Sequence, residues 1–293
     1  MSTTSQEHFE RGSLLHEQGQ IDDAVTELRE AVRLDSTSSD AYINLGVALA
    51  DQGLPLQARE AYRQALQLQP EDAAAHYNEG LVSMELGLAD EATISFQSAA
   101  RFSPDDADTH YALGNAQAQG SQPDAAIDSY NEAIRLQPDM MEAHFNLGTI
   151  LKEVGRVDEA ISSYEKALHL APKNAKIHYS LGNALRSKGS IKEAVASYRK
   201  AIRLHPEYQS AYYNLGLTLA EDGQIAKAIV AYENVIRINP NDASSHLNLG
   251  NLFEQRNRIR EACAEWRIAV GFGQGKTKET AQHALEDHAE ERT

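Results

Sequence analysis

The stretch MEAHFNLGTILKEVGRVDEAISSYEKALHLAP, residues 141–172, decides the fold of this chain. It contains two segments in which apolar residues recur at helical spacing, and Gly155 lies between them. The first segment carries the pair Leu147-Gly148, and Pro172 closes the unit. Because glycine breaks a helix and proline cannot continue one, the pattern predicts two short amphipathic helices joined by a tight turn.

The same landmarks return at a step of 34 residues along nearly the whole sequence. The glycine of the first helix recurs as Gly12, Gly46, Gly80, Gly114, Gly148, Gly182, Gly216 and Gly250. The first alanine of the second helix recurs as Ala24, Ala58, Ala92, Ala126, Ala160, Ala194, Ala228 and Ala262. The closing proline recurs as Pro70, Pro104, Pro138, Pro172, Pro206 and Pro240. Eight copies at a fixed period indicate stacked repeats, each of which contacts only its neighbours.

This pattern resembles the tetratricopeptide repeat family, which couples Leu-Gly in helix A to Ala-x3-Tyr-x2-Ala in helix B and then a proline. The resemblance implies an all-α fold, an α-solenoid of eight 34-residue helix-turn-helix repeats that form a right-handed superhelix. Gly148 and Ala160 are expected to face each other where the two helices cross, with Tyr164 in the wider gap. The expected bounds are an N-terminal tail at 1–4, repeats at 5–38, 39–72, 73–106, 107–140, 141–174, 175–208, 209–242 and 243–274, and a C-terminal capping helix and tail at 275–293.

Composition limits the classes of function. The net charge is −16, and this excess of acid leaves no basic footprint for nucleic acid. Cys263 is the only cysteine, so neither an intrachain disulfide nor a thiolate metal cluster is expected. No apolar run approaches the roughly 20 residues of a membrane-spanning helix, and the N-terminus lacks the pattern of a secretory signal. We therefore expect a soluble cytoplasmic protein without membrane insertion.

The charge is unevenly divided along the chain. Residues 1–140 contain 7 Lys+Arg and 24 Asp+Glu, a net charge of −17, whereas residues 141–293 contain 20 and 19, a net charge of +1. The first lysine of the sequence is Lys152. This asymmetry has two interpretations: a partner of matching polarity, or solvated acidic faces that keep an elongated protein soluble.

Two patterns that suggest a metal or a cofactor have simpler explanations. Histidine occupies the fourth position of six repeats, as His8, His76, His110, His144, His178 and His246. Stacked repeats hold equivalent residues about 10 Å apart, too far to share one zinc ion, so these rings are expected to pack between helices. The segment GFGQGKT, residues 271–277, has Val270 where a phosphate-binding loop requires its first glycine. We expect no catalytic residue, metal or cofactor.

The resemblance places ligand contacts on helix A, at the second, fifth, sixth and ninth positions of each repeat. The sixth position is asparagine in five of the eight repeats: Asn44, Asn78, Asn146, Asn214 and Asn248. This row resembles the asparagine ladder in the repeat region of O-linked N-acetylglucosamine transferase. Because an amide offers both a donor and an acceptor, each asparagine is expected to pair with the N–H and C=O of an extended peptide.

Further residues of the same face are expected to contact the side chains of the peptide. Aromatic residues at the fifth position would form a wall suited to such contacts: Tyr111, Phe145, Tyr179 and Tyr213. Lys152, Lys176 and Arg186, with Asn183 among them, predict that the groove becomes basic past its middle.

Three hypotheses of function follow. The first is a non-enzymatic scaffold that binds an extended peptide or a partner helix in its concave groove. The second is a structural scaffold that associates with itself as a homo-oligomer. The third is a subunit that recruits substrates to a separate enzyme, such as a glycosyltransferase. Because repeat arrays serve unrelated roles on one scaffold, the sequence does not identify the partner.

Overall fold

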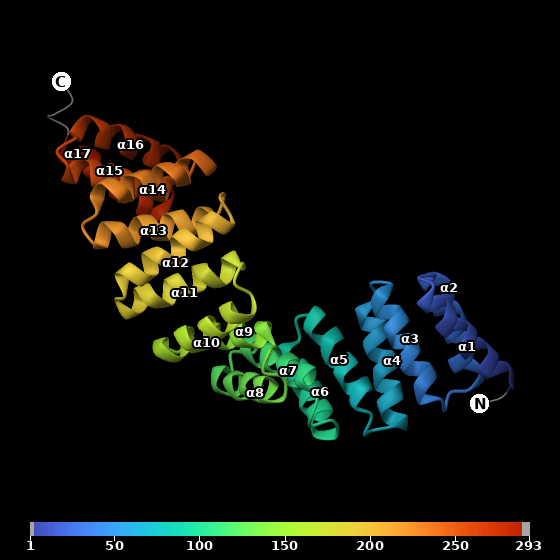
Figure 1. The fold of residues 1–293 in the computed structure, drawn as a ribbon. Helices are drawn as coiled ribbons and strands as arrows, with labels where there is room; N and C mark the ends of the chain where they lie inside the picture. The colour runs from blue at the N-terminus through green and yellow to red at the C-terminus, as the bar shows by residue number, and fades with distance from the viewer. Residues whose placement is uncertain (1–2, 289–293) are drawn as a thin grey trace. The chain divides into compact units, whose positions relative to one another are not determined.

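The computed structural model describes residues 3–288, which form seventeen α-helices and no strand (Figure 1). The helices of the N-terminal part are α1 (Thr3–Glu17), α2 (Ile21–Leu34), α3 (Ser39–Asp51), α4 (Pro55–Leu68), α5 (Ala73–Glu85), α6 (Ala89–Phe102), α7 (Ala107–Gln119) and α8 (Pro123–Leu136). They are followed by α9 (Met141–Glu153), α10 (Val157–Leu170), α11 (Ala175–Lys188), α12 (Ile191–Leu204), α13 (Gln209–Glu221), α14 (Ile225–Ile238), α15 (Ala243–Gln255), α16 (Ile259–Phe272) and α17 (Gly275–Asp287). The predicted all-α architecture of repeated helix pairs is confirmed.

The chain divides into two compact units, unit 1 at residues 1–150 and unit 2 at residues 151–293. Within each unit an odd-numbered helix packs against the even-numbered helix that follows, as in the pairs α3/α4 and α11/α12. The division coincides with the change in charge that the sequence shows. Unit 1 carries 7 Lys+Arg and 25 Asp+Glu, a net charge of −18, and unit 2 carries 20 and 18, a net charge of +2.

In six of the described helix pairs a glycine of the odd-numbered helix lies against an aromatic ring of the even-numbered helix, whereas in α1/α2 Gly12 lies against Leu28. A Cβ atom added to Gly182 in α11 would lie 2.7 Å from the ring of Tyr198 in α12, and one added to Gly46 would lie 2.6 Å from that of Tyr62. These rings are almost wholly buried, and the alanines of the even helices, such as Ala194, are fully buried. The ring therefore lies directly on the glycine, which differs from the expectation that it fills a gap beside a glycine–alanine contact.

The histidines of the fourth position join successive helix pairs. In five of them Nε2 lies 2.9–3.0 Å from the carbonyl oxygen of the proline six residues earlier: His76, His110, His144, His178 and His246. Each ring therefore pairs with a carbonyl group just past the end of the preceding even helix, where helical partners are lacking. Each histidine bonds to its own proline, in agreement with the expectation of a structural role.

Helix α17 covers the end of unit 2. Ala281 and Leu285 join the apolar core formed by α15 and α16, as a capping helix would. The α16–α17 junction falls in the GFGQGKT segment, where α16 ends at Phe272 and α17 begins at Gly275. The last part of the predicted C-terminal tail, residues 289–293, lies outside the described residues, as do residues 1–2. Helix α1 begins at Thr3, inside the predicted N-terminal tail.

The close glycine–ring contact predicts a strong dependence of stability on the missing side chain. Gly182→Ala should lower the free energy of unfolding by roughly 1–3 kcal/mol, because the new methyl group overlaps Tyr198. The matched control is Gly271→Ala in α16, where no atom lies within 4 Å. This control should be neutral or stabilising by up to about 1 kcal/mol, since alanine favours helix. Urea unfolding followed by circular dichroism measures both, and equal effects would contradict the packing argument.

Two turns inside the helix pairs lack the glycine that the others use. Gly155 and Gly189 have positive φ angles of 82° and 83°, whereas the equivalent turn of the fourth repeat places Ser121 at φ 57°. Because a Cβ atom strains this left-handed conformation, Ser121→Gly should stabilise the protein by about 1 kcal/mol. The reciprocal change Gly155→Ser should destabilise by a similar amount in the same unfolding assay. If Ser121→Gly destabilised the protein, the strain argument would be wrong.

Candidate functional site

The predicted asparagine row lies on the odd-numbered helices, and all five of its side chains are partly exposed. Four of the five donate hydrogen bonds to the preceding odd-numbered helix. Asn44 donates to the Ser13 hydroxyl at 2.9 Å, and Asn248 donates to the Tyr213 hydroxyl at 3.2 Å. The Asn78 side chain makes no hydrogen bond among the described residues, because the two acceptor places of the other links, 31 and 35 residues earlier, hold Val47 and Ile43. The row therefore also links one repeat to the next.

In unit 2 one link of the row forms a cluster of four residues. Asn214 of α13 donates one amide hydrogen to the Tyr179 hydroxyl at 3.0 Å and the other to Asn183 Oδ1 at 2.8 Å. The buried Tyr198 of α12 donates its hydroxyl to the same Asn183 oxygen at 2.7 Å. Burial raises the pKa of this tyrosine, so the hydroxyl stays protonated and remains a donor.

Unit 1 contains the same cluster in the same positions of the repeat. Asn146 donates to the Tyr111 hydroxyl at 3.2 Å and to Asn115 Oδ1 at 2.9 Å, and Tyr130 donates to that oxygen at 2.9 Å. The ring centroids of the two tyrosines lie 6.1 Å apart here, the same separation as in the cluster of unit 2. We call these two sets, Tyr111/Asn115/Tyr130/Asn146 and Tyr179/Asn183/Tyr198/Asn214, the asparagine clusters.

Each asparagine cluster leaves one donor and one acceptor unused. Both amide hydrogens of Asn214 are donated inside the protein, which differs from the expectation that this amide is wholly available to a ligand. Among the described residues nothing donates to its Oδ1, and nothing accepts from Nδ2 of Asn183. The two amides therefore act as one unit, in which Asn183 offers N–H groups and Asn214 offers an oxygen.

The ninth position of the repeat carries a further set of asparagines that was not predicted as a set. They occur as Asn115, Asn183 and Asn251, at a spacing of 68 residues, which is two repeats. Asn251 Oδ1 accepts from the indole N–H of Trp266 at 2.9 Å, as its counterparts accept from tyrosine. These asparagines recur in every second repeat, and a comparison of positions that are conserved from each repeat to the next does not reveal such a spacing.

An open hollow of about 520 Å³ in unit 2 brings several predicted site residues together. Its lining is Lys152, Asn183, Arg186, Ser187, Tyr198, Asn214 and Glu221. The predicted residue Lys176 is exposed at the start of α11 and is not part of this lining. Four predicted contacts, Lys152, Asn183, Arg186 and Asn214, thus share one concave surface.

The charges of the hollow are partly paired. The Arg186 guanidinium binds both carboxylate oxygens of Glu221 in α13, with Nε 3.0 Å from Oε2. The hydrogen bond to Glu221 raises the pKa of Arg186, and the same bond lowers the pKa of Glu221, so both stay charged near neutral pH. Because Glu221 neutralises Arg186, this arginine makes the hollow less basic than the sequence predicts. Lys152 has no hydrogen-bond or ion-pair partner among the described residues.

The fifth-position aromatic residues have a structural contact as well as an exposed part. The Tyr213 ring packs edge-on against Tyr232 with a centroid distance of 5.7 Å, and its hydroxyl accepts from Asn248. Tyr179 packs against Tyr208 at 5.0 Å. Tyr111, Phe145, Tyr179 and Tyr213 are all partly exposed. Their predicted contact with a ligand stays a prediction.

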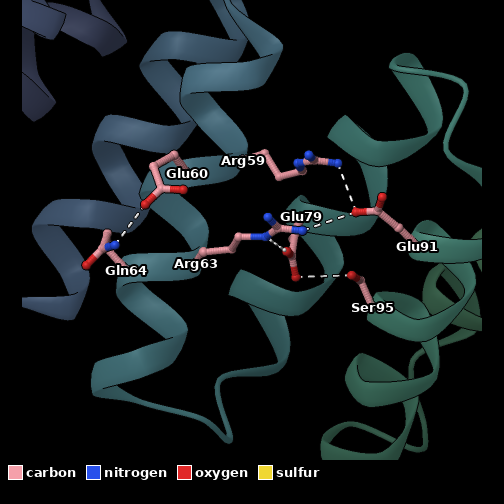
Figure 2. A network of polar contacts seen from close by, with 7 residues as sticks. All are labelled: Arg59, Glu60, Arg63, Gln64, Glu79, Glu91 and Ser95. Carbon is pink, nitrogen blue, oxygen red and sulfur yellow. Dashed lines mark hydrogen bonds and ion pairs between the residues drawn. The ribbon is translucent and has the colours of Figure 1, made fainter.

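Some of the acidic side chains of unit 1 link its helices to one another (Figure 2). Glu79 of α5 stands where six other repeats carry leucine. Its carboxylate lies 3.1 Å from Arg63 Nε and accepts the Ser95 hydroxyl at 3.1 Å. Arg59 and Arg63 both bind Glu91 of α6, at 2.9 and 3.1 Å. These carboxylates link α4, α5 and α6 and are already paired, which favours an internal role for this part of the acidic charge.

Between residues 3 and 288, no three His, Cys, Asp or Glu side chains gather in a way that could hold a metal ion. No described helix combines the length and the apolar character that crossing a membrane requires.

Comparison with known families decides the class of repeat. A model of the TPR repeat matches residues 12–53, 182–223 and 218–257, and a model of the tetratricopeptide repeat matches residues 49–107 and 111–175. The chain belongs to the tetratricopeptide repeat family. Tetratricopeptide repeats generally form non-catalytic surfaces for protein interaction. The likeness to the O-linked N-acetylglucosamine transferase repeats stays a prediction. Among curated proteins no match to the sequence was found.

Several solved structures resemble the chain. YrrB, a TPR protein with an unusual peptide-binding site, is 27% identical, with a TM-score of 0.58 over 63% of this chain and 95% of YrrB. MamA is 28% identical, with a TM-score of 0.51 over 61% of this chain and 97% of MamA. The C-terminal part of a TPR repeat-containing protein from Cytophaga hutchinsonii covers 83% of this chain and 99% of its own, with a TM-score of 0.72. Its identity is 16%, so this likeness concerns the fold alone.

Proposed function

We propose that the protein is a non-enzymatic scaffold whose asparagine clusters bind the main chain of an extended peptide. The observation that carries this proposal is the unused donor and acceptor of the paired amides. Asn183 and Asn214 lie side by side, 2.8 Å apart at their hydrogen-bonded atoms, and both line the same open hollow. Asn115 and Asn146 offer the same groups in unit 1.

An extended peptide matches this arrangement. The N–H and C=O of one residue in a β-strand point to the same side, and they pair with a neighbouring donor and acceptor in antiparallel sheets. The peptide C=O would accept from Asn183 Nδ2, and the N–H of the same residue would donate to Asn214 Oδ1. Because every residue except proline has these two groups, such contacts supply affinity without reading side chains.

The rigid placement of the amides adds to this argument. The hydroxyls of Tyr179 and Tyr198 hold the two amides in place through hydrogen bonds of 3.0 and 2.7 Å. Side chains that are already fixed lose little entropy when a ligand arrives, so more of each hydrogen bond appears as affinity. The chain also resembles YrrB, a TPR protein with an unusual peptide-binding site, and this likeness is consistent with peptide binding.

The other predicted contacts extend this site. Asn44, Asn78 and Asn248 occupy the sixth position of further repeats, and Asn78 has its whole amide available among the described residues. Phe145 and Tyr213 would contact side chains of the peptide from the fifth position. Lys176 would meet an acidic group near the start of α11.

One isosteric substitution distinguishes the role of Asn183 in peptide binding from its role in linking neighbouring repeats. Asn183→Asp keeps the Oδ1 that accepts from Tyr198 and Asn214, and it replaces the free N–H groups with a second acceptor. The matched control is Asn174→Asp at the N-cap of α11, where an oxygen accepts from Lys176 N and Ile177 N and either residue serves. Both variants add the same charge.

We expect Asn183→Asp to change stability by less than about 0.5 kcal/mol and to weaken peptide binding about tenfold. The probe is a set of short linear peptides selected from a randomised library against the wild-type protein, with affinities measured by fluorescence anisotropy. Asn174→Asp should bind these peptides like the wild type. Unchanged affinity in Asn183→Asp would remove the paired amides from the binding site.

A further inference from the structure

A repeated pairing between neighbouring odd-numbered helices is incomplete at one place in unit 2. In two places a basic side chain at the twelfth position of a repeat meets an acid 35 residues later, at the thirteenth position of the next repeat. His16 Nε2 lies 2.7 Å from Asp51 Oδ2, and Arg186 binds Glu221. Lys152 is at the same repeat position, and the residue 35 places after it is Ser187.

Ser187 cannot replace the missing acid. It carries no charge, and its hydroxyl donates to the Asn183 carbonyl oxygen in the preceding turn of α11 at 3.0 Å. The other carboxylate of the hollow, Glu221, is bound on both oxygens by Arg186. Lys152 is therefore the one cation of this lining without a partner among the described residues.

We propose that a side-chain carboxylate of the bound peptide takes the place of the missing acid and pairs with Lys152. This inference rests on the proposed function and adds a preference for an acidic residue to it. Lys152 lines the same hollow as Asn183 and Asn214, so one peptide reaches the paired amides and the ammonium group together. The peptide that fits carries Asp or Glu next to the segment whose main chain the amides hold.

The net charge of the lining agrees with this occupant. Arg186 and Glu221 cancel each other, and Lys152 leaves a charge of +1 on a surface whose remaining residues are neutral. The free Nδ2 of Asn183 is a second donor toward an incoming carboxylate or carbonyl oxygen. An acidic side chain thus gains a charge-assisted contact there, whereas a basic one meets an unpaired ammonium group.

Three variants test the pairing. Lys152→Met removes the ammonium group and keeps an aliphatic stem. Ser187→Glu supplies the missing acid from within the chain, as Asp51 and Glu221 do for their partners. Lys173→Met makes the same charge change as Lys152→Met at an exposed position in the turn after α10, outside the hollow. Circular dichroism and thermal melting check that all three are folded.

The probe is a library of randomised short peptides with a fixed neutral segment at each end, so that no terminal carboxylate can occupy the site. Selection on the wild type and on Lys173→Met should enrich Asp or Glu at one position. Selection on Lys152→Met and on Ser187→Glu should lose this enrichment. A Glu→Gln change in a selected peptide should weaken binding to the wild type roughly fivefold and should not change binding to Lys152→Met.

Each outcome of these selections either supports or overturns the pairing with Lys152. Equal acidic enrichment on the wild type and on Lys152→Met would overturn the pairing while leaving the main-chain site intact. Selection on the wild type without any preference for Asp or Glu would also overturn the pairing and leave the main-chain site intact. If the wild type selected no peptide above background, the proposed function itself would fail, and this inference would fail with it.

Discussion

The contact between a glycine and a buried ring is the constraint on which the rest of the structure depends. Gly182 lets the Tyr198 ring lie directly on α11, and in this position the tyrosine hydroxyl donates to Asn183. Asn183 then accepts from Asn214 of the next repeat. A packing requirement inside one helix pair thus fixes the geometry of a polar row between two pairs.

The buried ring also explains which repeats have a hydrogen-bonded asparagine at the ninth position. Every described ninth-position asparagine accepts from a ring that carries a hydroxyl or an indole N–H: Asn115 from Tyr130, Asn183 from Tyr198 and Asn251 from Trp266. The third repeat has Phe96 as its ring and Leu81 at the ninth position, so neither the donor nor the acceptor is present. A tyrosine ring alone is not sufficient, because the repeats with Tyr62 and Tyr232 carry Val47 and Leu217 at the ninth position, so the link needs both the ring donor and the asparagine acceptor. Stacking and proposed binding use the same side chains, which is why a substitution that separates them must be isosteric.

The fold could be predicted from the sequence, because the landmarks at a step of 34 residues are local and regular. A thin apolar stripe predicted a capping helix near the C-terminus, and Ala281 and Leu285 of this stripe lie in the core of unit 2. The site was predicted only in part. The asparagines were found by position, but their donors are used by groups 31 and 35 residues away in the chain, across a helix–helix interface. Such partners depend on the rotation of one helix pair against the next, which apolar periodicity does not determine. The Arg186–Glu221 pair was missed for the same reason.

The central claim is that paired amides, fixed by the stacking of repeats, present one donor and one acceptor to a peptide main chain. Side-chain amide resonances of selectively ¹⁵N-asparagine-labelled protein, recorded while a library-selected peptide is titrated in, test it most directly. The Nδ2 hydrogens of Asn183 should shift with the peptide, because they gain an acceptor. Those of Asn214, which already donate to Tyr179 and Asn183, should shift much less. Asn183 resonances that stay unchanged at saturating peptide would contradict the account.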